Sequence, residues 1–305
     1  MQPIPVILDT DMATDCDDAG ALAMLLNLER QNQAEVLGVV VNNRGGTSVG
    51  AVAAITAFYG RPDIPMGAYQ GDVVGVEDTE LARSLAEDTA AFGHRVRDRR
   101  EVPSAHLVYR RLLAQRERAD VVIISIGHLN NLVELLDSPG DDHSPENGID
   151  LVRRSVSHAV VMGGNYPSGK EHNFYARGSA ASTVRFMEVW PTPTPILFSG
   201  YELGVRVLTG PGLAQFGDEH PVARAYRHHP TRPLQNGRPS WDQTAVLAAI
   251  AGPEVHWDLS TPGWNRIAPD GANQWEPDPT SPHTYLLERD PPEIVAAAIE
   301  RLMLG

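Results

Sequence analysis

Short apolar runs alternate with helix-like segments along this chain, and this alternation limits the possible folds more than any other feature. Five of the runs are rich in Val and Ile and bounded by turn-forming residues, a pattern typical of strands buried on both faces. These runs are residues 5–8, 35–41, 120–126, 158–162 and 195–198. Since strands alternating with helices form βαβ units, we expect an α/β fold with an open, mainly parallel or mixed, Rossmann-like central sheet flanked by helices.

The segments between these runs have helical patterns and contain no convincing linker. The predicted helices are 17–29, 48–59, 104–116, 129–136, 179–189, 241–250 and 292–303. Residues 263–287 are expected to form a β-hairpin, 138–148 and 228–240 surface loops, and 70–103 a polar, mobile flap. We therefore predict a single domain over residues 1–305.

Composition excludes several classes of protein. With 25 basic and 39 acidic residues, the net charge of −14 argues against nucleic acid or an anionic membrane as a partner. Cys16 is the only cysteine, so no internal disulfide and no cysteine-based metal site can form. No apolar run approaches the roughly 20 residues of a membrane span, and no signal pattern precedes the first strand. A soluble cytoplasmic protein is the expectation.

An unusual density of aspartates follows the first predicted strand. The stretch DTDMATDCDD holds five of them between Asp9 and Asp18. Asp9 and Asp11 lie where the strand ends, while Asp17 and Asp18 begin the next helix. In open α/β sheets, sites form at the carboxyl ends of strands, so these carboxylates can converge there. Like charges so close would repel each other, and a hard divalent cation such as Ca²⁺ would remove the conflict.

This stretch allows two other interpretations. The acids could cap the helix and be solvated, but capping needs only one or two of them. Alternatively, D-x-D after a first strand resembles the haloacid-dehalogenase phosphotransferases, with Asp9 as nucleophile and Asp11 as general acid. That family usually has Thr or Val at the position of Ala13, and its late acidic motif is missing from the strand ends at 162–165 and 199–202.

The motif DTDMATDCDDAGAL more closely resembles the fingerprint of the nucleoside hydrolases of the inosine–uridine preferring type, DTDPGxDDAxAL. Two extra residues give it the form DTDxxxDxDD, as in a variant branch. Further segments resemble the family in the same order along the chain. They are VVVNNRGG at 39–46, SIGHLNNL at 125–132, MGGNYPSGKEHN at 162–173 and PSWDQTAVL at 239–247. The resemblance implies the nucleoside hydrolase fold and hydrolysis of an N-glycosidic bond.

This resemblance also implies roles for individual residues. Asp11 would be the general base that activates water. The Ca²⁺ ligands would be Asp11, Asp18, the backbone carbonyl of Asn130 and Asp242. The residues expected to bind the substrate are Asp17, Asn42, Asn165, Glu171, Asn173 and Trp241. The substrate would be a small-molecule nucleoside or N-riboside, and the assembly a homodimer or homotetramer. Asp9 and Asp15 receive no role.

The sequence leaves open which group protonates the leaving base. Trp241 occupies the place of a His credited in several family members with protonating the leaving base, and an indole cannot do so. A catalytically silent protein that binds metal and ribose on the same fold is therefore a second hypothesis. We expect residues 70–103 and 225–241 to build the pocket for the base, which stays unidentified. The candidates are His94, Tyr226, His228, His229 and Trp241.

Overall fold

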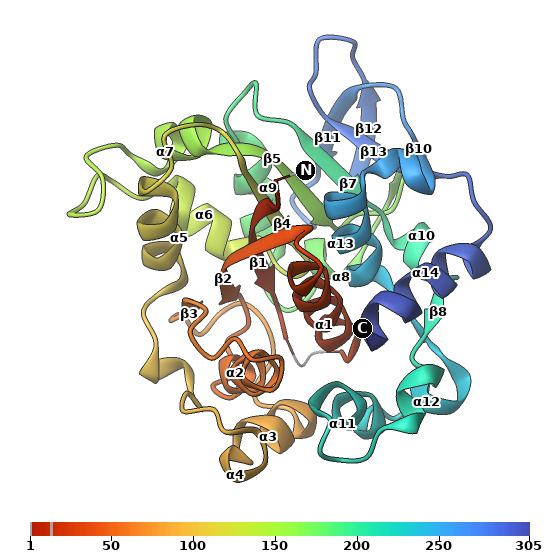
Figure 1. Ribbon diagram of the computed structural model, residues 1–305. Coiled ribbons are helices and arrows are strands. Elements are labelled where there is room, and N and C mark those ends of the chain that lie inside the picture. Colours follow the sequence, from red (N-terminus) through yellow and green to blue (C-terminus); the bar gives the residue numbers. More distant parts are fainter. Residues whose placement is uncertain (1, 13–14) are drawn as a thin grey trace.

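A central eight-stranded sheet organises the chain in the computed structural model, which describes residues 2–12 and 15–305 (Figure 1). Every neighbouring pair is parallel except β10 with β13, so the sheet is mixed but mainly parallel, as expected. In sheet order the strands are β10 (Trp257–Leu259), β13 (Thr284–Glu288), β7 (Ile196–Ser199), β5 (Val156–Met162), β4 (Val121–Ser125), β1 (Ile4–Thr10), β2 (Ala34–Val41) and β3 (Met66–Ala68). All five strands predicted from apolar runs are confirmed.

The apolar runs are continuous because the sheet is buried on both faces. Within β1, Val6 and Leu8 belong to one hydrophobic core, while Ile7 between them belongs to the other. Ile124 and Ile123 of β4 divide in the same way. Since side chains alternate along a strand, each residue of such a run must be apolar to fill one of two cores.

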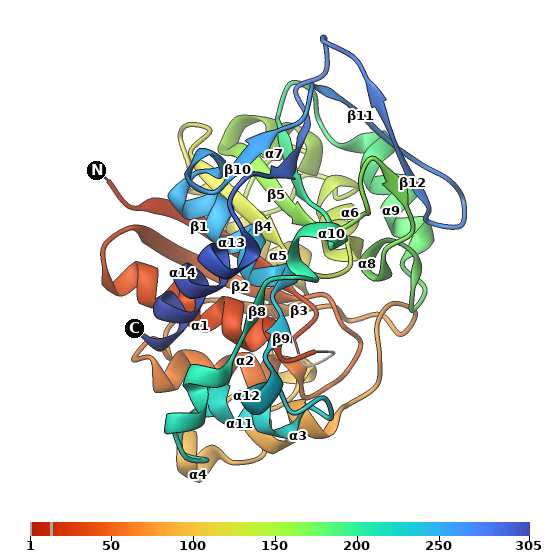
Figure 2. The same ribbon diagram turned by 90° about the vertical axis from the view of Figure 1, so that its right-hand side faces the viewer.

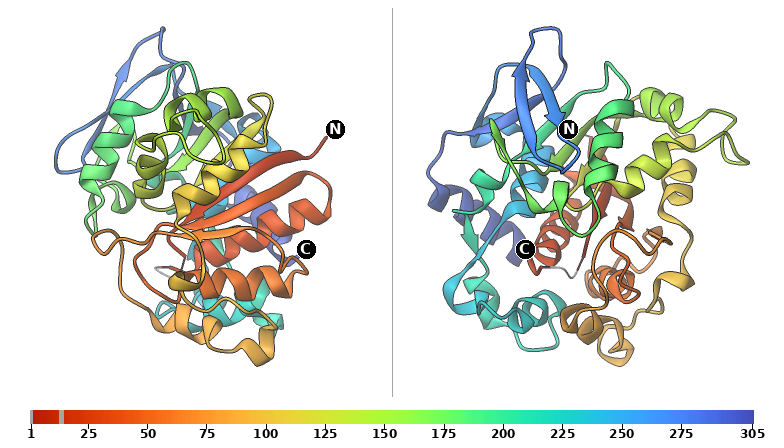
Figure 3. Two further views of the ribbon diagram at one scale, coloured as in Figure 1. Left: turned by 90° about the vertical axis from the view of Figure 1, so that its left-hand side faces the viewer. Right: turned by 180° about the vertical axis from the view of Figure 1, so that it is seen from behind.

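Helices cover both faces of the sheet (Figures 1 and 3). The first core is closed by α1 (Asp17–Arg30), α2 (Ser48–Phe58), α13 (Trp241–Ala251) and α14 (Pro292–Leu304). The second core is closed by α5 (Ala105–Ala114), α6 (Asn130–Leu136), α7 (Gly148–Ser155) and α9 (Ala180–Val189). The seven predicted helices are all present. Only α7 was missed among these eight.

The segments predicted as a flap and a loop both contain helices, and these pack against the helix at 221–228 beyond the sheet edge (Figure 2). Residues 70–103 form α3 (Glu80–Ala86), α4 (Thr89–Phe92) and the short η1 (Arg99–Glu101), facing α11 (Pro221–His228) and α12 (Pro233–Asn236). Arg224 of α11 joins them, because its guanidinium donates to Asp88 Oδ2 at 2.8 Å and lies over the Phe92 ring. The prediction of a surface loop over 228–240 was wrong at 233–236, where α12 lies.

The predicted hairpin is present but shorter than expected. Strands β11 (Gly263–Ile267) and β12 (Asn273–Pro277) pair antiparallel, and β12 also pairs with β6 (Ser168–Gly169). The hairpin projects from the body of the molecule (Figure 2). Residues 284–287, which were assigned to the hairpin, instead belong to β13 of the central sheet. Their partners there are β7 and β10, which periodicity alone could not indicate.

The remaining elements are short. They are α8 (His172–Tyr175), α10 (Tyr201–Gly204), β8 (Leu208–Thr209), η2 (Pro211–Gln215), β9 (Arg238–Pro239) and η3 (Pro253–Val255). Ala13, which bears on the phosphotransferase alternative, lies outside the described residues. Among the helices formed by residues 2–12 and 15–305, none has the length and hydrophobicity needed to span a bilayer.

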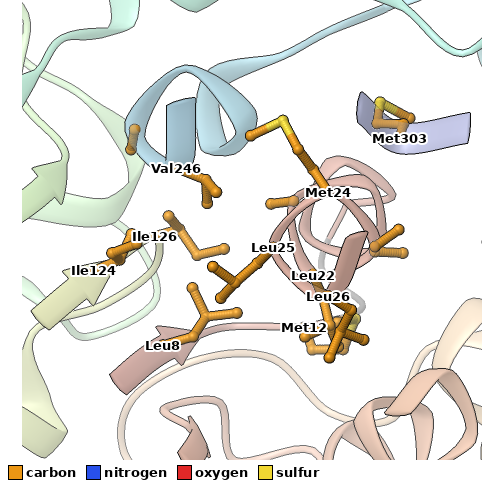
Figure 4. Close-up of a cluster of buried hydrophobic side chains, with 14 of the residues drawn as sticks. Leu8, Met12, Leu22, Met24, Leu25, Leu26, Ile124, Ile126, Val246 and Met303 are labelled. Atoms are coloured by element: carbon orange, nitrogen blue, oxygen red, sulfur yellow. The ribbon is translucent and has the colours of Figure 1, made fainter. Parts of the chain in front are cut away.

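Leu25 of α1 shows how the first core holds the aspartate-rich end of this helix in place. Its side chain is fully buried and reaches toward Leu8 of β1, Ile126 after β4 and Val246 of α13 (Figure 4). One side chain therefore joins two strands and two helices, and three of these elements carry aspartates at their ends.

We predict that Leu25→Ala lowers the free energy of unfolding by about 2–5 kcal/mol, because it removes buried methyl groups and leaves a cavity. The midpoint of urea unfolding, followed by circular dichroism, measures this loss. The matched control is Leu259→Ala, at a side chain that is 49% exposed, and its effect should stay within about 0.5 kcal/mol. Equal losses in the two variants would contradict the central position of Leu25.

Candidate active site

A cavity of about 440 Å³ opens at the carboxyl edge of the sheet, where sites of open α/β folds form. Asp11, Ile126, Met162 and Tyr201 reach it from the ends of β1, β4, β5 and β7. The other lining residues come from helix starts and connecting segments. They are Asp15, Asp17, Asp18, Val76, Thr79, Glu171, His172, Asn173, Arg177, Arg238, Trp241 and Asp242. The sheet topology thus brings residues from most of the chain to one place.

Three carboxylates form a buried cluster in this cavity. Asp17, Asp18 and Asp242 each offer an oxygen within 4.8 Å of the others, and each side chain is almost fully buried. Burial raises the pKa of all three carboxyl groups well above the usual range, and repulsion from the neighbouring carboxylates raises it further. Few partners offset this cost: Thr10 Oγ1 donates to Asp18, and the Asp242 amide donates to Asp17 Oδ2 at 3.4 Å.

These oxygens fit a hard divalent cation. Such ions prefer several carboxylate and carbonyl oxygens, and a cation at this point would replace mutual repulsion by attraction. Asp18 and Asp242, which the sequence assigned to the metal, are both in the cluster. Asp17, which the sequence assigned to the sugar, lies with them and is equally placed to be a ligand. The arrangement therefore defines an acidic candidate metal centre.

Asp11 and Asp9 are two residues apart but lie in different surroundings. Asp11 lines the cavity, and its Oδ2 is 3.9 Å from His128 Nε2. Asp9 is fully buried and does not line the cavity; it accepts hydrogen bonds from Asn42 (2.8 Å), Tyr109 (2.9 Å) and Asn131 (3.1 Å). Burial raises the pKa of Asp9 to about 7, although these donors oppose the shift. Asp9 thus ties β1 to its neighbours and is poorly placed for the attack that the phosphotransferase alternative requires.

Asn42 and Asn130 lie behind the cavity wall. The side chain of Asn42 donates to Asp9 and accepts from the His128 amide at 3.1 Å, and the side chain of Asn130 donates to the Asn42 carbonyl at 3.1 Å. Gly127 lets these groups approach, because a Cβ there would lie 2.6 Å from the Asp11 amide nitrogen. Neither asparagine lines the cavity, so their predicted contacts with substrate and metal stay predictions.

The block from 162 to 173 brings two of its three predicted residues into the cavity. Glu171 is buried and accepts hydrogen bonds from the amides of Gly164 (3.1 Å) and Asn173 (2.8 Å). Burial raises its pKa to about 7. Asn173 donates to the Met162 carbonyl at 3.3 Å. Asn165 instead bonds through its backbone to the Asn273 side chain and does not line the cavity.

Aromatic and basic side chains form one wall of the cavity. Trp241 stacks on Tyr201 with ring centroids 5.5 Å apart, and its indole N–H donates to the Tyr201 carbonyl at 3.1 Å. The guanidinium of Arg238 lies over the Trp241 ring and binds both carboxylate oxygens of Asp15. Asp15, which had no role in the sequence, thus orients Arg238 and is also 3.3 Å from His229 Nε2.

The expected pocket segments contribute, but mostly through other residues than those proposed. Val76 and Thr79 come from the 70–103 segment, and Arg238 and Trp241 from the 225–241 segment. The other candidates do not line the cavity: His94, Tyr226, His228 and His229. Sequence reasoning missed His172, Arg177, Tyr201 and Arg238. A signal existed for His172, which lies between Glu171 and Asn173 in a block already singled out.

Comparison with known proteins decides the family. The sequence pattern described as "Inosine-uridine preferring nucleoside hydrolase" matches residues 6–263, which is most of the chain. The chain belongs to this nucleoside hydrolase family. It is therefore a hydrolase that acts on N-glycosyl compounds, as the sequence predicted. Among curated protein sequences, none matches.

Solved structures support the fold of this nucleoside hydrolase. An inosine-guanosine nucleoside hydrolase has a TM-score of 0.70 at 20% identity, over 98% of each chain. An inosine-uridine preferring nucleoside hydrolase from Bacillus anthracis has a TM-score of 0.69 at 15% identity, over 99% of each chain. The type III effector XopQ, solved with adenosine diphosphate ribose, has a TM-score of 0.68 at 17% identity, over 99% of this chain and 94% of its own.

We predict that the metal-free protein loses thermal stability as the pH rises. The folded protein keeps protons on Asp17, Asp18 and Asp242 at pH values where the unfolded chain has released them, since the three pKa values are raised. The stability present below about pH 4 is therefore lost progressively toward alkaline pH. Saturating Ca²⁺ should raise the melting temperature at pH 8 by on the order of 5 °C, measured in chelator-treated protein with and without added Ca²⁺.

Asp242→Asn should weaken both the loss of stability at high pH and the stabilisation by Ca²⁺, because it removes one of the repelling charges and one ligand. The control is Asp142→Asn, at an exposed loop position outside the cavity, which should behave as the unchanged protein does. A melting temperature that does not respond to Ca²⁺ at any pH would contradict the metal centre.

Proposed function

We propose that this chain is an N-ribohydrolase that uses Ca²⁺ to cleave a ribonucleoside, or a related N-riboside, into ribose and free base. The observation that supports this most directly is the position of Asp11 beside the Asp17, Asp18 and Asp242 cluster, in the cavity that also holds Glu171 and Asn173. Carboxylates and an amide around one cavity are suited to a hard cation and to the hydroxyl groups of a sugar.

The residues of the chain suit the charge that develops during the reaction. Cleavage of the N-ribosidic bond gives the sugar an oxocarbenium-like positive charge, which nearby carboxylates stabilise. Asp11 accepts the proton of the attacking water as general base. Asp18, Asp242, Asp11 and the Asn130 carbonyl would hold the cation. When bound, it would supply positive charge that lowers the pKa of water and neutralises the cluster.

Substrate contacts divide into two groups by position. Asp17, Glu171 and Asn173 line the cavity and would bind ribose hydroxyls directly. Asn42 and Asn165 would act from behind it or after a rearrangement on binding. Trp241 would contact the base from the aromatic wall.

We further propose that residues 1–305 work as one domain in a homodimer or homotetramer. Light scattering after size-exclusion chromatography would measure the number of subunits.

A catalytically silent binding protein is the second candidate, and Trp241 favours it. The indole N–H is already bonded to the Tyr201 carbonyl, so this residue has no proton to offer to a leaving base. Such a protein would keep the metal and bind ribosides without turnover.

Release of ribose distinguishes these two functions. Purine and pyrimidine ribonucleosides are incubated with the Ca²⁺-loaded protein, and free ribose is measured with and without a chelator. ADP-ribose belongs in the panel because the XopQ structure contains it, and its cleavage is followed as release of adenine, since both of its riboses stay on the pyrophosphate. We expect ribose release that the chelator abolishes. Ca²⁺ and riboside binding without any release would instead support the silent binding protein.

We predict that Asp11→Asn lowers kcat by about 10²–10⁴-fold at saturating Ca²⁺, because it removes the general base. Asp9→Asn serves as the comparison, since Asp9 lies outside the cavity; it should lower stability more than kcat. Initial rates and thermal melts on both variants give the two quantities. A larger loss of kcat at Asp9 than at Asp11 would contradict the proposed roles.

A further inference from the structure

The family resemblance supplies no proton donor for the departing base in this chain. When the N-ribosidic bond breaks, its electron pair goes to a ring nitrogen of the base, and protonation of the base makes it a better leaving group. Trp241 stands where the usual histidine would be, and its N–H is committed to the Tyr201 carbonyl. Either another group supplies the proton or the base leaves without a strong acid; the first alternative rests on the proposed hydrolysis.

Most titratable groups around the cavity are already engaged. Asp11, Asp17, Asp18 and Asp242 surround the candidate cation position. Asp15 is held by the guanidinium of Arg238 as a paired anion. Both carboxylate oxygens of Glu171 accept backbone N–H groups, which favours its role as an acceptor. Tyr201 offers a phenol, and phenols are weaker acids than an imidazolium.

His172 is the one histidine among the described residues that line the cavity. It is the first residue of α8, and its main chain is fixed by the Ala176 amide, which donates to its carbonyl at 2.9 Å. The residue is only partly buried, and its ring stacks on His128 with centroids 6.3 Å apart and meets the edge of Tyr175 at the same distance. Within residues 2–12 and 15–305, no hydrogen bond engages either ring nitrogen of His172. The imidazole is thus oriented by ring contacts while its nitrogens remain available to a ligand.

We propose that His172 is the general acid that protonates the departing base. As the C1′–N bond breaks, the imidazolium N–H of His172 gives its proton to the base nitrogen that receives the electron pair. The water oxygen bonds to C1′ and its proton goes to Asp11. The products are ribose and the neutral base, and solvent exchange returns the proton from Asp11 to His172. Every atom and charge is accounted for by the two side chains and one water.

The charges that face His172 are balanced. Asp11 and Asp15 favour its protonated form, while His128 and Arg177 oppose it, and partial burial lowers its pKa below the usual 6.5. A histidine with this pKa is a stronger acid than an unperturbed one, and part of it remains protonated at mildly acidic pH. These surroundings predict an alkaline limb in the rate–pH profile of the nucleoside reaction.

A pair of substrates isolates this proton transfer. One is the ribonucleoside that the protein hydrolyses best, and the other is p-nitrophenyl β-D-ribofuranoside, whose nitrophenolate leaves without a proton. For His172→Gln we expect kcat on the nucleoside to fall by about 10²-fold or more. We expect kcat on the nitrophenyl riboside to stay within a few-fold, and the alkaline limb to disappear with the nucleoside. His143→Gln, at an exposed loop position, is the matched control and should change neither rate.

Other outcomes overturn the proposal in distinguishable ways. An equal loss on both substrates would show that His172 only positions the sugar. Unchanged rates on both would show that it has no part in the reaction. Melting temperature and Ca²⁺ binding of His172→Gln, compared with the unchanged protein, reveal any loss through misfolding. If the unchanged protein cleaves neither substrate, the proposed hydrolase function fails, and the role of His172 fails with it.

Discussion

Repulsion between buried carboxylates is the constraint around which this structure is arranged. Asp17, Asp18 and Asp242 lie within a few ångströms of one another, out of water, where like charges are costly. Few hydrogen-bond donors approach them, in contrast to the ion-paired Asp15 beside them. A fold that keeps such a cluster must hold it by other means. Here the apolar packing of α1 and α13 against the sheet holds it, with Leu25 between them (Figure 4).

The polar network behind the cavity supplies the second support. Asp9 accepts hydrogen bonds from Asn42 after β2, Tyr109 of α5 and Asn131 of α6, and so it links the end of β1 to these elements. Gly127 permits the close approach of β4 to the Asp11 backbone. Asp9 and Asp11, which are separated by one residue, thus have different structural roles. Asp9 points into the protein and organises the edge of the sheet, while Asp11 lines the cavity.

Sequence reasoning was most accurate where a residue pattern is local and long. The five apolar runs and the seven helical patterns all correspond to elements, because each is set by the alternation or periodicity of its own residues. The failures have physical causes as well. The short α12 has too few residues for a periodic pattern, and β13 joins the central sheet because it pairs with β7 and β10 rather than with β12. For the site, the aspartate-rich motif and the Glu171 block were recognisable because they are dense in unusual residue types. His172, Arg177 and Arg238 were not, because isolated basic residues occur throughout the surface.

The sequence alone determined the fold class, the family resemblance and the place of the carboxylates at the end of the first strand, since all of these depend on residues close together in the chain. Only the tertiary structure decided which polar groups share the cavity. It brought Asp242 to Asp17 and Asp18, turned Asp9 away from them, and bound Arg238 to Asp15. It also placed His172 at the cavity, where no hydrogen bond from the described residues engages its ring nitrogens. The reason is that some of these neighbours lie more than two hundred positions apart in the chain. The distances between their side chains follow from how the helices pack on the sheet.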